Sequence, residues 1–267
     1  MSDQSVSPQL LSAAEQQLQQ GFNAWHTARA STDLLPRLYA EAMGDAYPDE
    51  VGAFSSCDWT VLGAMVTRLR MRPCQVLIDL GCGTGGVGLW LARALNLRLV
   101  GIDISDTAIE LAAARRAAFV ARDRAEFRVG TLQASGLGDR IAHGVVCVDA
   151  LSFAPDRAAA LQEIRRILRP GARAVLTRAG RLGADLVRQA ASAGFEVEHV
   201  QERPEEPELW RRLYRLWVAH EAHLRRELGN PQAETMLGEG ARMLPRLDGR
   251  RAVIVTLRRP DALQPSR

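Results

Sequence analysis

The stretch VLIDLGCGTGG, residues 76–86, decides the fold. Its first five residues form a short apolar run that is typical of a buried strand, and the glycines after them predict a tight turn. A helix is predicted to begin near Gly86 and to continue through Leu89, Leu91 and Leu95. A strand, a glycine-rich turn and a helix in this order indicate a parallel sheet that is covered by helices.

The same alternation continues along the chain. Six further runs of strand length follow, most of them separated by segments with helical periodicity, and a predicted helix from Trp59 to Leu69 precedes the first strand. We therefore predict an α/β fold with a Rossmann-like, doubly wound sheet and right-handed crossovers. The predicted strands are residues 75–79, 97–102, 126–129, 144–148, 173–176, 195–200 and 251–257.

Two segments lie outside this alternation. Residues 1–20 are polar and are expected to fray, whereas residues 21–45 predict one or two helices. Residues 205–246 are helical in pattern and are too long for an ordinary loop between the last two strands. We expect an N-terminal helical lid at 1–70 and a core at 71–267 that carries a helical insertion at about 205–246.

Composition excludes several kinds of function. All 34 basic residues are Arg, so lysine-dependent Schiff-base, phosphate-loop and kinase chemistry is excluded. The net charge of +3 is too small and too scattered to indicate nucleic-acid binding. No apolar run approaches the ~20 residues of a membrane span, and the first residues do not resemble a secretory signal. The four cysteines and five histidines lack metal-ligand spacing. We expect a cytoplasmic protein without bound metal, nucleic acid or membrane.

The glycine turn is compatible with two kinds of cofactor. Gly81, Gly83 and Gly86 satisfy the GxGxxG pattern of dinucleotide-binding proteins. Asp79, two residues before the first glycine, argues against a dinucleotide because its carboxylate would repel a pyrophosphate. S-adenosylmethionine has no phosphate and carries an ammonium and a sulfonium, so an acid at this position favours it. Glycines allow the backbone to approach such a ligand closely.

At this point the chain resembles the class I S-adenosylmethionine-dependent methyltransferases. The sequence DLGCGTG at 79–85 is similar to their first motif, and LRPG at 168–171 is similar to a motif that ends one of their helices. The resemblance covers residues 75–178 well and residues 195–257 more loosely. It implies the strand order 3-2-1-4-5-7-6 with an antiparallel seventh strand, and S-adenosylmethionine as the cofactor.

The resemblance also assigns residues to the cofactor. It implies that Asp103 binds the ribose hydroxyls, that Ile104 packs on adenine, and that Asp149 and Ala150 line the methionine arm. Thr131 stands where the family often has an aspartate for the adenine amino group, so a neutral and weaker contact is implied there. The implied cofactor site consists of Asp79, Gly81, Cys82, Gly83, Asp103, Ile104, Thr131, Leu132, Asp149 and Ala150.

Plainer roles compete for some of these residues. Asp79 and Asp103 can be capping residues with no role in cofactor binding, and Asp149 can be a simple turn residue. Cys82 in the glycine turn is better explained as a small packed residue than as a nucleophile.

The acceptor pocket is expected to come from three segments. These are the helices before the first strand, the residues after the fourth strand and the 205–246 insertion, whose aromatic side chains suit an apolar or planar small molecule. Arg178, after the fifth strand, is positioned for an acceptor carboxylate or for a surface ion pair. The candidates are Tyr39, Tyr47, Phe54, Trp59, Phe153, Arg178, Trp210 and Tyr214, and each aromatic residue can instead be part of the core.

No residue is identified as a catalytic base. His26, His220 and His223 lie on helical segments and can approach a pocket, whereas His143 precedes a strand at the opposite end. The predicted function is methyl transfer from S-adenosylmethionine to an O, N or C atom of a small molecule, resembling enzymes of bacterial specialised metabolism such as antibiotic biosynthesis. The alternatives are a non-methylating reaction such as a cyclisation, and a non-catalytic partner protein.

Overall fold

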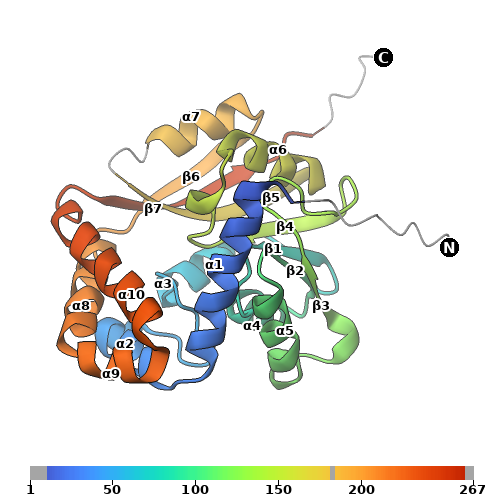
Figure 1. Cartoon of the computed structure of the whole chain (residues 1–267). Coiled ribbons are helices and arrows are strands. Elements are labelled where there is room, and N and C mark those ends of the chain that lie inside the picture. The colour runs from blue at the N-terminus through green and yellow to red at the C-terminus, as the bar shows by residue number, and fades with distance from the viewer. Residues whose placement is uncertain (1–10, 181–183, 262–267) are drawn as a thin grey trace, which may run out of the picture.

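The computed structural model describes residues 11–180 and 184–261, and they form a seven-stranded sheet surrounded by helices (Figure 1). The strand order is β3-β2-β1-β4-β5-β7-β6. The first five strands pair in parallel, and β7 runs antiparallel between β5 and β6. This confirms the predicted fold class and strand order. The strands are β1 (Val76–Leu80), β2 (Arg98–Asp103), β3 (Ala125–Val129), β4 (Ala142–Cys147), β5 (Leu168–Gly180), β6 (Glu196–Glu202) and β7 (Arg251–Arg258).

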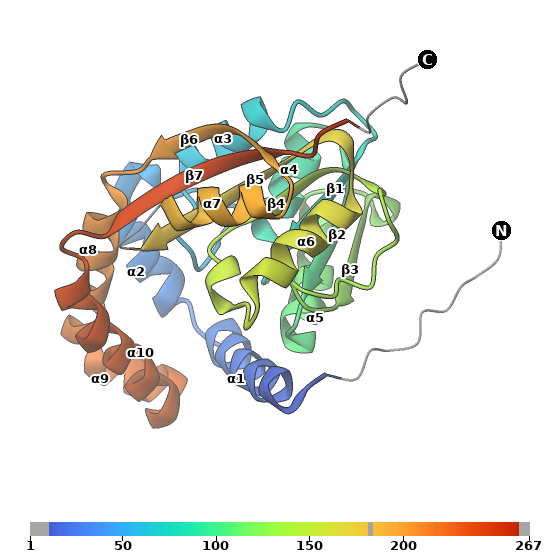
Figure 2. The ribbon, with the colours of Figure 1, turned by 90° about the horizontal axis from the view of Figure 1, so that it is seen from above.

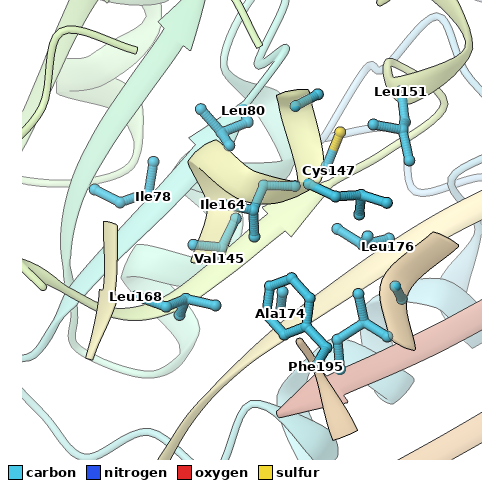
Figure 3. Close-up of a cluster of buried hydrophobic side chains, with 14 of the residues drawn as sticks. Ile78, Leu80, Val145, Cys147, Leu151, Ile164, Leu168, Ala174, Leu176 and Phe195 are labelled. Atoms are coloured by element: carbon cyan, nitrogen blue, oxygen red, sulfur yellow. The ribbon is translucent and has the colours of Figure 1, made fainter. Parts of the chain in front are cut away.

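Both faces of the sheet are buried, which explains why its central strands are apolar throughout. Ile78 and Leu80 of β1 point to one face, where α6 (Arg157–Ile167) and α7 (Ala184–Ser192) pack. Leu77 of the same strand points to the other face, against α3 (Trp59–Arg68) and α4 (Gly86–Ala94). Figure 3 shows the first cluster, in which Ile164 of α6 lies among the side chains of β1, β4 and β5.

A separate group of helices forms what we call the helical roof. It consists of α1 (Ala13–Ala30), α2 (Leu34–Met43), α8 (Glu206–Ala219), α9 (Glu221–Leu228) and α10 (Asn230–Met243). Helices α2, α8, α9 and α10 share a third hydrophobic cluster around Tyr39, Leu213 and Trp217. Helix α1 lies between α10 and α5 (Asp106–Arg115), as Figures 1 and 2 show.

The expectation that residues 1–20 fray is wrong for residues 13–20, which belong to α1. The Ser12 hydroxyl accepts a hydrogen bond from the Glu15 backbone N–H, and the Glu15 carboxylate accepts one from the Ser12 N–H. This reciprocal pair satisfies two free donors at the helix start and stabilises it. Residues 1–10 lie outside the described residues.

One further difference concerns the core. The LRPG motif follows the end of a helix as expected, because α6 ends at Ile167, but the strand is longer than expected. β5 already begins at Leu168 and contains a bulge opposite Ala142 and Gly144. The three residues before α7, 181–183, lie outside the described residues. Within the described residues, no helix is both long and apolar enough to span a membrane.

Candidate active site

A cavity of about 1290 Å³ lies between the carboxyl ends of the parallel strands and the helical roof. All ten residues of the predicted cofactor site line this cavity, together with side chains from α1, α2, α8 and α10. Pockets for a single small ligand typically enclose about 300–1000 Å³. This cavity therefore has room for a cofactor and a second molecule.

The glycine turn brings backbone to the cavity wall. Gly81 has a φ of +72°, and a Cβ added to it would lie 2.2 Å from the Ala150 Cβ. The backbone N–H groups of Gly81 and Cys82 both donate to the Ile102 carbonyl, at 2.8 and 3.0 Å, and tie the turn to β2. Only glycine fits at position 81, because its φ is positive and because Ala150 leaves no room for a Cβ.

Asp79 is a buried carboxylate at the tip of β1. It accepts a hydrogen bond of 3.0 Å from the Gly88 N–H in the first turn of α4, so it also stabilises the start of that helix. Burial raises the pKa of its carboxyl to about 7, and the negative charge of Asp103 acts in the same direction. A cationic group in the cavity would restore the ionised form. The ammonium of S-adenosylmethionine fits this requirement.

Asp103 is held by backbone donors at the tip of β2. One carboxylate oxygen accepts from the Gly83 N–H at 2.8 Å, and the other accepts from the Ser105 N–H at 2.9 Å. Burial raises the pKa of this carboxyl, while these hydrogen bonds oppose the shift. A carboxylate has about four lone-pair positions, so two remain for a diol. Asp103 is thus both a structural acceptor and free to bind ribose hydroxyls.

Thr131 and Cys82 line the cavity, but their side chains mainly stabilise the local structure. The Thr131 hydroxyl accepts a hydrogen bond of 3.0 Å from the Ala134 N–H, which occupies part of its capacity as an acceptor. Gln133, which the sequence did not single out, lines the cavity beside it and offers an amide. Burial raises the pKa of the Cys82 thiol, so the thiol stays neutral and is not an activated nucleophile.

Asp149 connects the sheet to the segment before α3. Its two carboxylate oxygens accept from the Ser56 N–H and the Thr177 hydroxyl, both at 2.7 Å. Arg203 donates to the Ser56 hydroxyl at 2.8 Å and pairs with Asp58 at 3.0 Å. The Asp149 carboxylate therefore fixes residues 55–58 above β4. The backbone of Asp149 has a φ of +54°, and this left-handed conformation turns the chain into the cavity wall.

Six of the eight acceptor-pocket candidates line the cavity. They are Tyr39, Phe54, Phe153, Arg178, Trp210 and Tyr214. Trp59 does not line it, because it starts α3 with its ring against Trp90 at 5.9 Å, and it is 44% exposed. Tyr47 is buried behind Tyr39, with ring centroids 6.4 Å apart, and does not line it either. For these two residues the expectation is corrected.

Sequence reasoning did not place His26, Arg29 and Glu239 in the site, but all three line the cavity. His26 was one of three helical histidines considered. The other two, His220 and His223, face each other at 5.9 Å and do not line the cavity. His143 accepts from the Val76 N–H near the start of β1, at the opposite end of the sheet, as expected.

The chain is similar to known methyltransferases in sequence. Residues 77–171 match the family model described as a methyltransferase domain. An O-methyltransferase of Pyrenophora dematioidea is 32% identical over 109 residues, which cover 41% of each chain. The 27-O-demethylrifamycin SV methyltransferase of Amycolatopsis mediterranei is 27% identical over 170 residues, which cover 63% of this chain and 60% of that enzyme. The chain thus spans less than two thirds of the length of either curated relative.

The solved structure of the [4+2]-cyclase SpnF has a similar fold. It superposes with a TM-score of 0.75 over 96% of this chain and 100% of the cyclase, at 18% sequence identity. At this identity the likeness is one of fold alone. It shows that the helical roof, and not only the sheet, has a counterpart in another protein.

Proposed function

We propose that this chain, which carries a methyltransferase domain of the class I S-adenosylmethionine-dependent type, transfers a methyl group to a small molecule bound under the helical roof. The family model and the sequence relatives bear out the predicted enzyme class. The predicted cofactor is supported by solved structures of similar fold that hold S-adenosylmethionine or S-adenosylhomocysteine. The acceptor and the methylated atom belong to the proposal.

One observation carries it. The cavity is continuous from Asp79 and Asp103 in the sheet to Tyr39, Trp210 and Tyr214 in the roof. Cation-binding carboxylates and backbone occupy one end, and aromatic walls occupy the other. Such a chamber suits a charged, ribose-containing cofactor next to an apolar acceptor.

The cofactor, when bound, supplies a methyl group on a sulfonium and leaves as a neutral thioether. The residues of this chain act by binding and orienting the two partners. Asp79 compensates the ammonium, Asp103 accepts from the ribose, and the glycine turn allows close contact. Holding two reactants in line lowers the barrier without a strong protein base. The roof excludes water, which strengthens these electrostatic contacts.

We further propose oxygen as the methylated atom and a natural-product-like acceptor. Support comes from the relatives, since one is an O-methyltransferase and another is a methyltransferase of 27-O-demethylrifamycin SV. The size of the cavity supports an acceptor larger than a simple metabolite. A cyclisation that leaves the methyl group on the cofactor is the second candidate, because the chain matches a [4+2]-cyclase along nearly its whole length.

The test is product analysis with S-adenosylmethionine labelled in its methyl group. Acceptors would be hydroxylated aromatic and macrocyclic compounds, including 27-O-demethylrifamycin SV. We expect label in an acceptor and equimolar S-adenosylhomocysteine, both lost in Gly81→Ala. An isomerised acceptor with the label still on the cofactor would establish the cyclase alternative. Absence of cofactor binding by calorimetry would instead indicate a non-catalytic partner protein.

A further inference from the structure

The inner face of α1 is unusual in what it buries. The two most buried side chains of the described helix are His26 and Arg29, which are 6% and 5% exposed. Phe22 and Trp25 on the same helix are only half-buried. A helix on a globular protein normally buries an apolar stripe. Core packing alone therefore does not explain why these two polar side chains point inward.

Arg29 lies in an aromatic pocket at the roof end of the cavity. Its guanidinium carbon is 3.3 Å from the Trp25 ring centroid and 5.0 Å from that of Phe54. Burial lowers the pKa of the guanidinium to about 10, while Tyr39 and Glu239 nearby oppose the shift. Arg29 therefore remains a cation at neutral pH. Stacking on aromatic faces is favourable for a guanidinium, but it leaves the in-plane N–H groups free.

This cation lacks a carboxylate partner within residues 11–180 and 184–261. Its polar neighbour is the Tyr39 hydroxyl, which is no anion, and its Nη1 atom has no hydrogen-bond partner among these residues. The nearby Glu239 carboxylate instead accepts a hydrogen bond of 3.0 Å from the Tyr214 hydroxyl. A buried charge without a partner is costly, and a bound anion removes that cost.

His26, one helical turn away, is uncharged at neutral pH. Burial, and then the positive charge of Arg29, lower the pKa of its imidazole to about 4. Its Cε1 atom lies 3.8 Å from where a Cβ on Gly83 would be, so the ring sits over the glycine turn. Its Nδ1 atom also has no hydrogen-bond partner among the described residues. The imidazole thus supplies a neutral polar contact between the cofactor end and Arg29.

The charges of the cavity are consequently separated. The buried acids Asp79 and Asp103 lie at the cofactor end, while Arg29 lies at the roof end with Tyr39 and Phe54. Glu239 also lines the roof end, where its carboxylate accepts from the Tyr214 hydroxyl. We propose that Arg29 binds an acidic oxygen of the acceptor, which is a phenol, an enol or a carboxylic acid held as its anion. This inference rests on the proposed function and names the substrate class of the same site.

The proposal explains why methyl transfer here needs no strong base. A guanidinium beside an acidic hydroxyl stabilises the oxyanion, so the proton is lost to solvent before the reaction. The acceptor oxygen then forms its bond to the methyl carbon as the carbon–sulfur bond breaks. The anion and the sulfonium become a neutral methyl ether or ester and a neutral thioether, which balances charge and atoms.

The experiment measures binding and does not depend on turnover. Calorimetry compares 2-naphthoate with its neutral analogue naphthalene-2-carboxamide, in protein with and without saturating S-adenosylhomocysteine. We expect the anion to bind about tenfold to hundredfold more tightly, the range of one charged hydrogen bond. Arg29→Met should abolish that preference, Arg29→Lys should keep part of it, and Arg37→Met, an exposed arginine of α2, should leave it unchanged. Equal binding of the two probes to the wild type would overturn the proposal.

A second experiment tests whether Arg29 binds the carboxylate of the cofactor and not that of the acceptor. S-adenosylhomocysteine carries a methionine-type carboxylate, whereas 5′-methylthioadenosine has none. If Arg29→Met weakens only the first ligand and leaves the naphthoate preference intact, Arg29 binds the cofactor and the acceptor assignment is wrong. If the preference is confirmed but no labelled product forms with any acceptor, the proposed methyl transfer fails while the anion site stands.

Discussion

The two ends of the cavity are built in different ways. The cofactor end uses backbone groups and carboxylates at the tips of adjacent strands, which hydrogen bonds such as Gly83 N–H to Asp103 hold in place. The roof end uses side chains from α1, α2, α8 and α10, which meet through aromatic contacts such as Tyr39 against Trp210. We infer that the cofactor end is rigid and sensitive to single atoms, whereas the roof end is adaptable.

The difference also concerns charge. The cofactor end buries two acids, and the roof end buries Arg29 and the neutral His26. Each end is thus incomplete without a ligand of opposite character. Variants that affect one end and spare the other test this division.

The largest effect is expected for Gly81→Ala. The new Cβ would lie 2.2 Å from the Ala150 Cβ at a φ of +72°. We expect a loss of stability of about 2–5 kcal/mol, the sum of ~1–2 kcal/mol for left-handed strain and ~1–3 kcal/mol for overpacking. Urea unfolding and calorimetry with S-adenosylhomocysteine would measure the losses of stability and of affinity.

Gly136→Ala is the matched control for this variant. Gly136 has a φ of +70°, but a Cβ there meets no atom within 4 Å. It should lose only the conformational part, about 1–2 kcal/mol, and should keep its cofactor affinity. Equal losses in the two variants would show that the close approach at Gly81 is unimportant.

The second test uses pH, because Asp79 and His26 shift stability in opposite directions. The pKa of His26 falls from 6.5 to about 4 on folding, so its contribution to stability is present above pH 6.5 and is lost as the pH falls toward 4. The pKa of Asp79 rises from 3.8 to about 7, so stability is lost as the pH rises through that window. Each effect amounts to about 3–4 kcal/mol in full, and they largely cancel in the wild type between pH 4 and 6.5.

Single variants remove the cancellation. Between pH 4.5 and 6.5, the unfolding free energy of Asp79→Asn should rise by about 2–3 kcal/mol relative to the wild type, and that of His26→Gln should fall by as much. Urea unfolding at both pH values measures this. Parallel pH profiles for the two variants would contradict the burial of a carboxyl group at the cofactor end and of a neutral imidazole at the roof end.

The contrast between the two ends explains how much could be predicted from the sequence. The cofactor end depends on short-range features, namely a strand, a glycine turn and acids at strand tips, so all ten predicted residues lie in one cavity. Helical periodicity identified the roof segments but not which of their side chains reach the cavity. Trp59 begins α3, which lies outside the roof and buries Leu62 and Met65 against the sheet, so Trp59 was wrongly expected in the pocket.

The missed residues of α1 have a related cause. The polar sequence before residue 21 was interpreted as frayed, and a histidine and an arginine on a helix normally face solvent. Their burial depends on Trp25, Phe54 and Tyr39, which come from three separate segments. No local pattern reports such a tertiary environment. The capping box at Ser12 and Glu15 was the one local signal that predicts the start of α1.

The third prediction concerns the cofactor end alone. Asp103→Asn should weaken binding of both S-adenosylhomocysteine and 5′-methylthioadenosine about tenfold to hundredfold, because both contain the ribose and a charged hydrogen bond contributes about 1.5–3 kcal/mol. Asp79→Asn should weaken only the first, which carries the ammonium. Asp106→Asn, at an exposed position of α5, is the control. Equal effects of the Asp79 and Asp103 variants on both ligands would refute the division of roles.

The smallest effect is expected where the roof is fastened to the cofactor end. The Gln19 side chain of α1 donates a hydrogen bond of 2.9 Å to the Ile104 carbonyl, next to Asp103. Gln19→Ala removes one such bond, which contributes about 0.5–1.5 kcal/mol. If α1 opens as a unit, its amides should exchange hydrogen about two- to tenfold faster, and the core strands should be unaffected. Gln20→Ala, an exposed position of the same helix, controls for helix propensity.

Equal exchange in the two variants would mean that the hydrogen bond from Gln19 does not hold the roof. Faster exchange in β1 and β2 as well would mean that roof and sheet open together, and the two ends would then not be separate units.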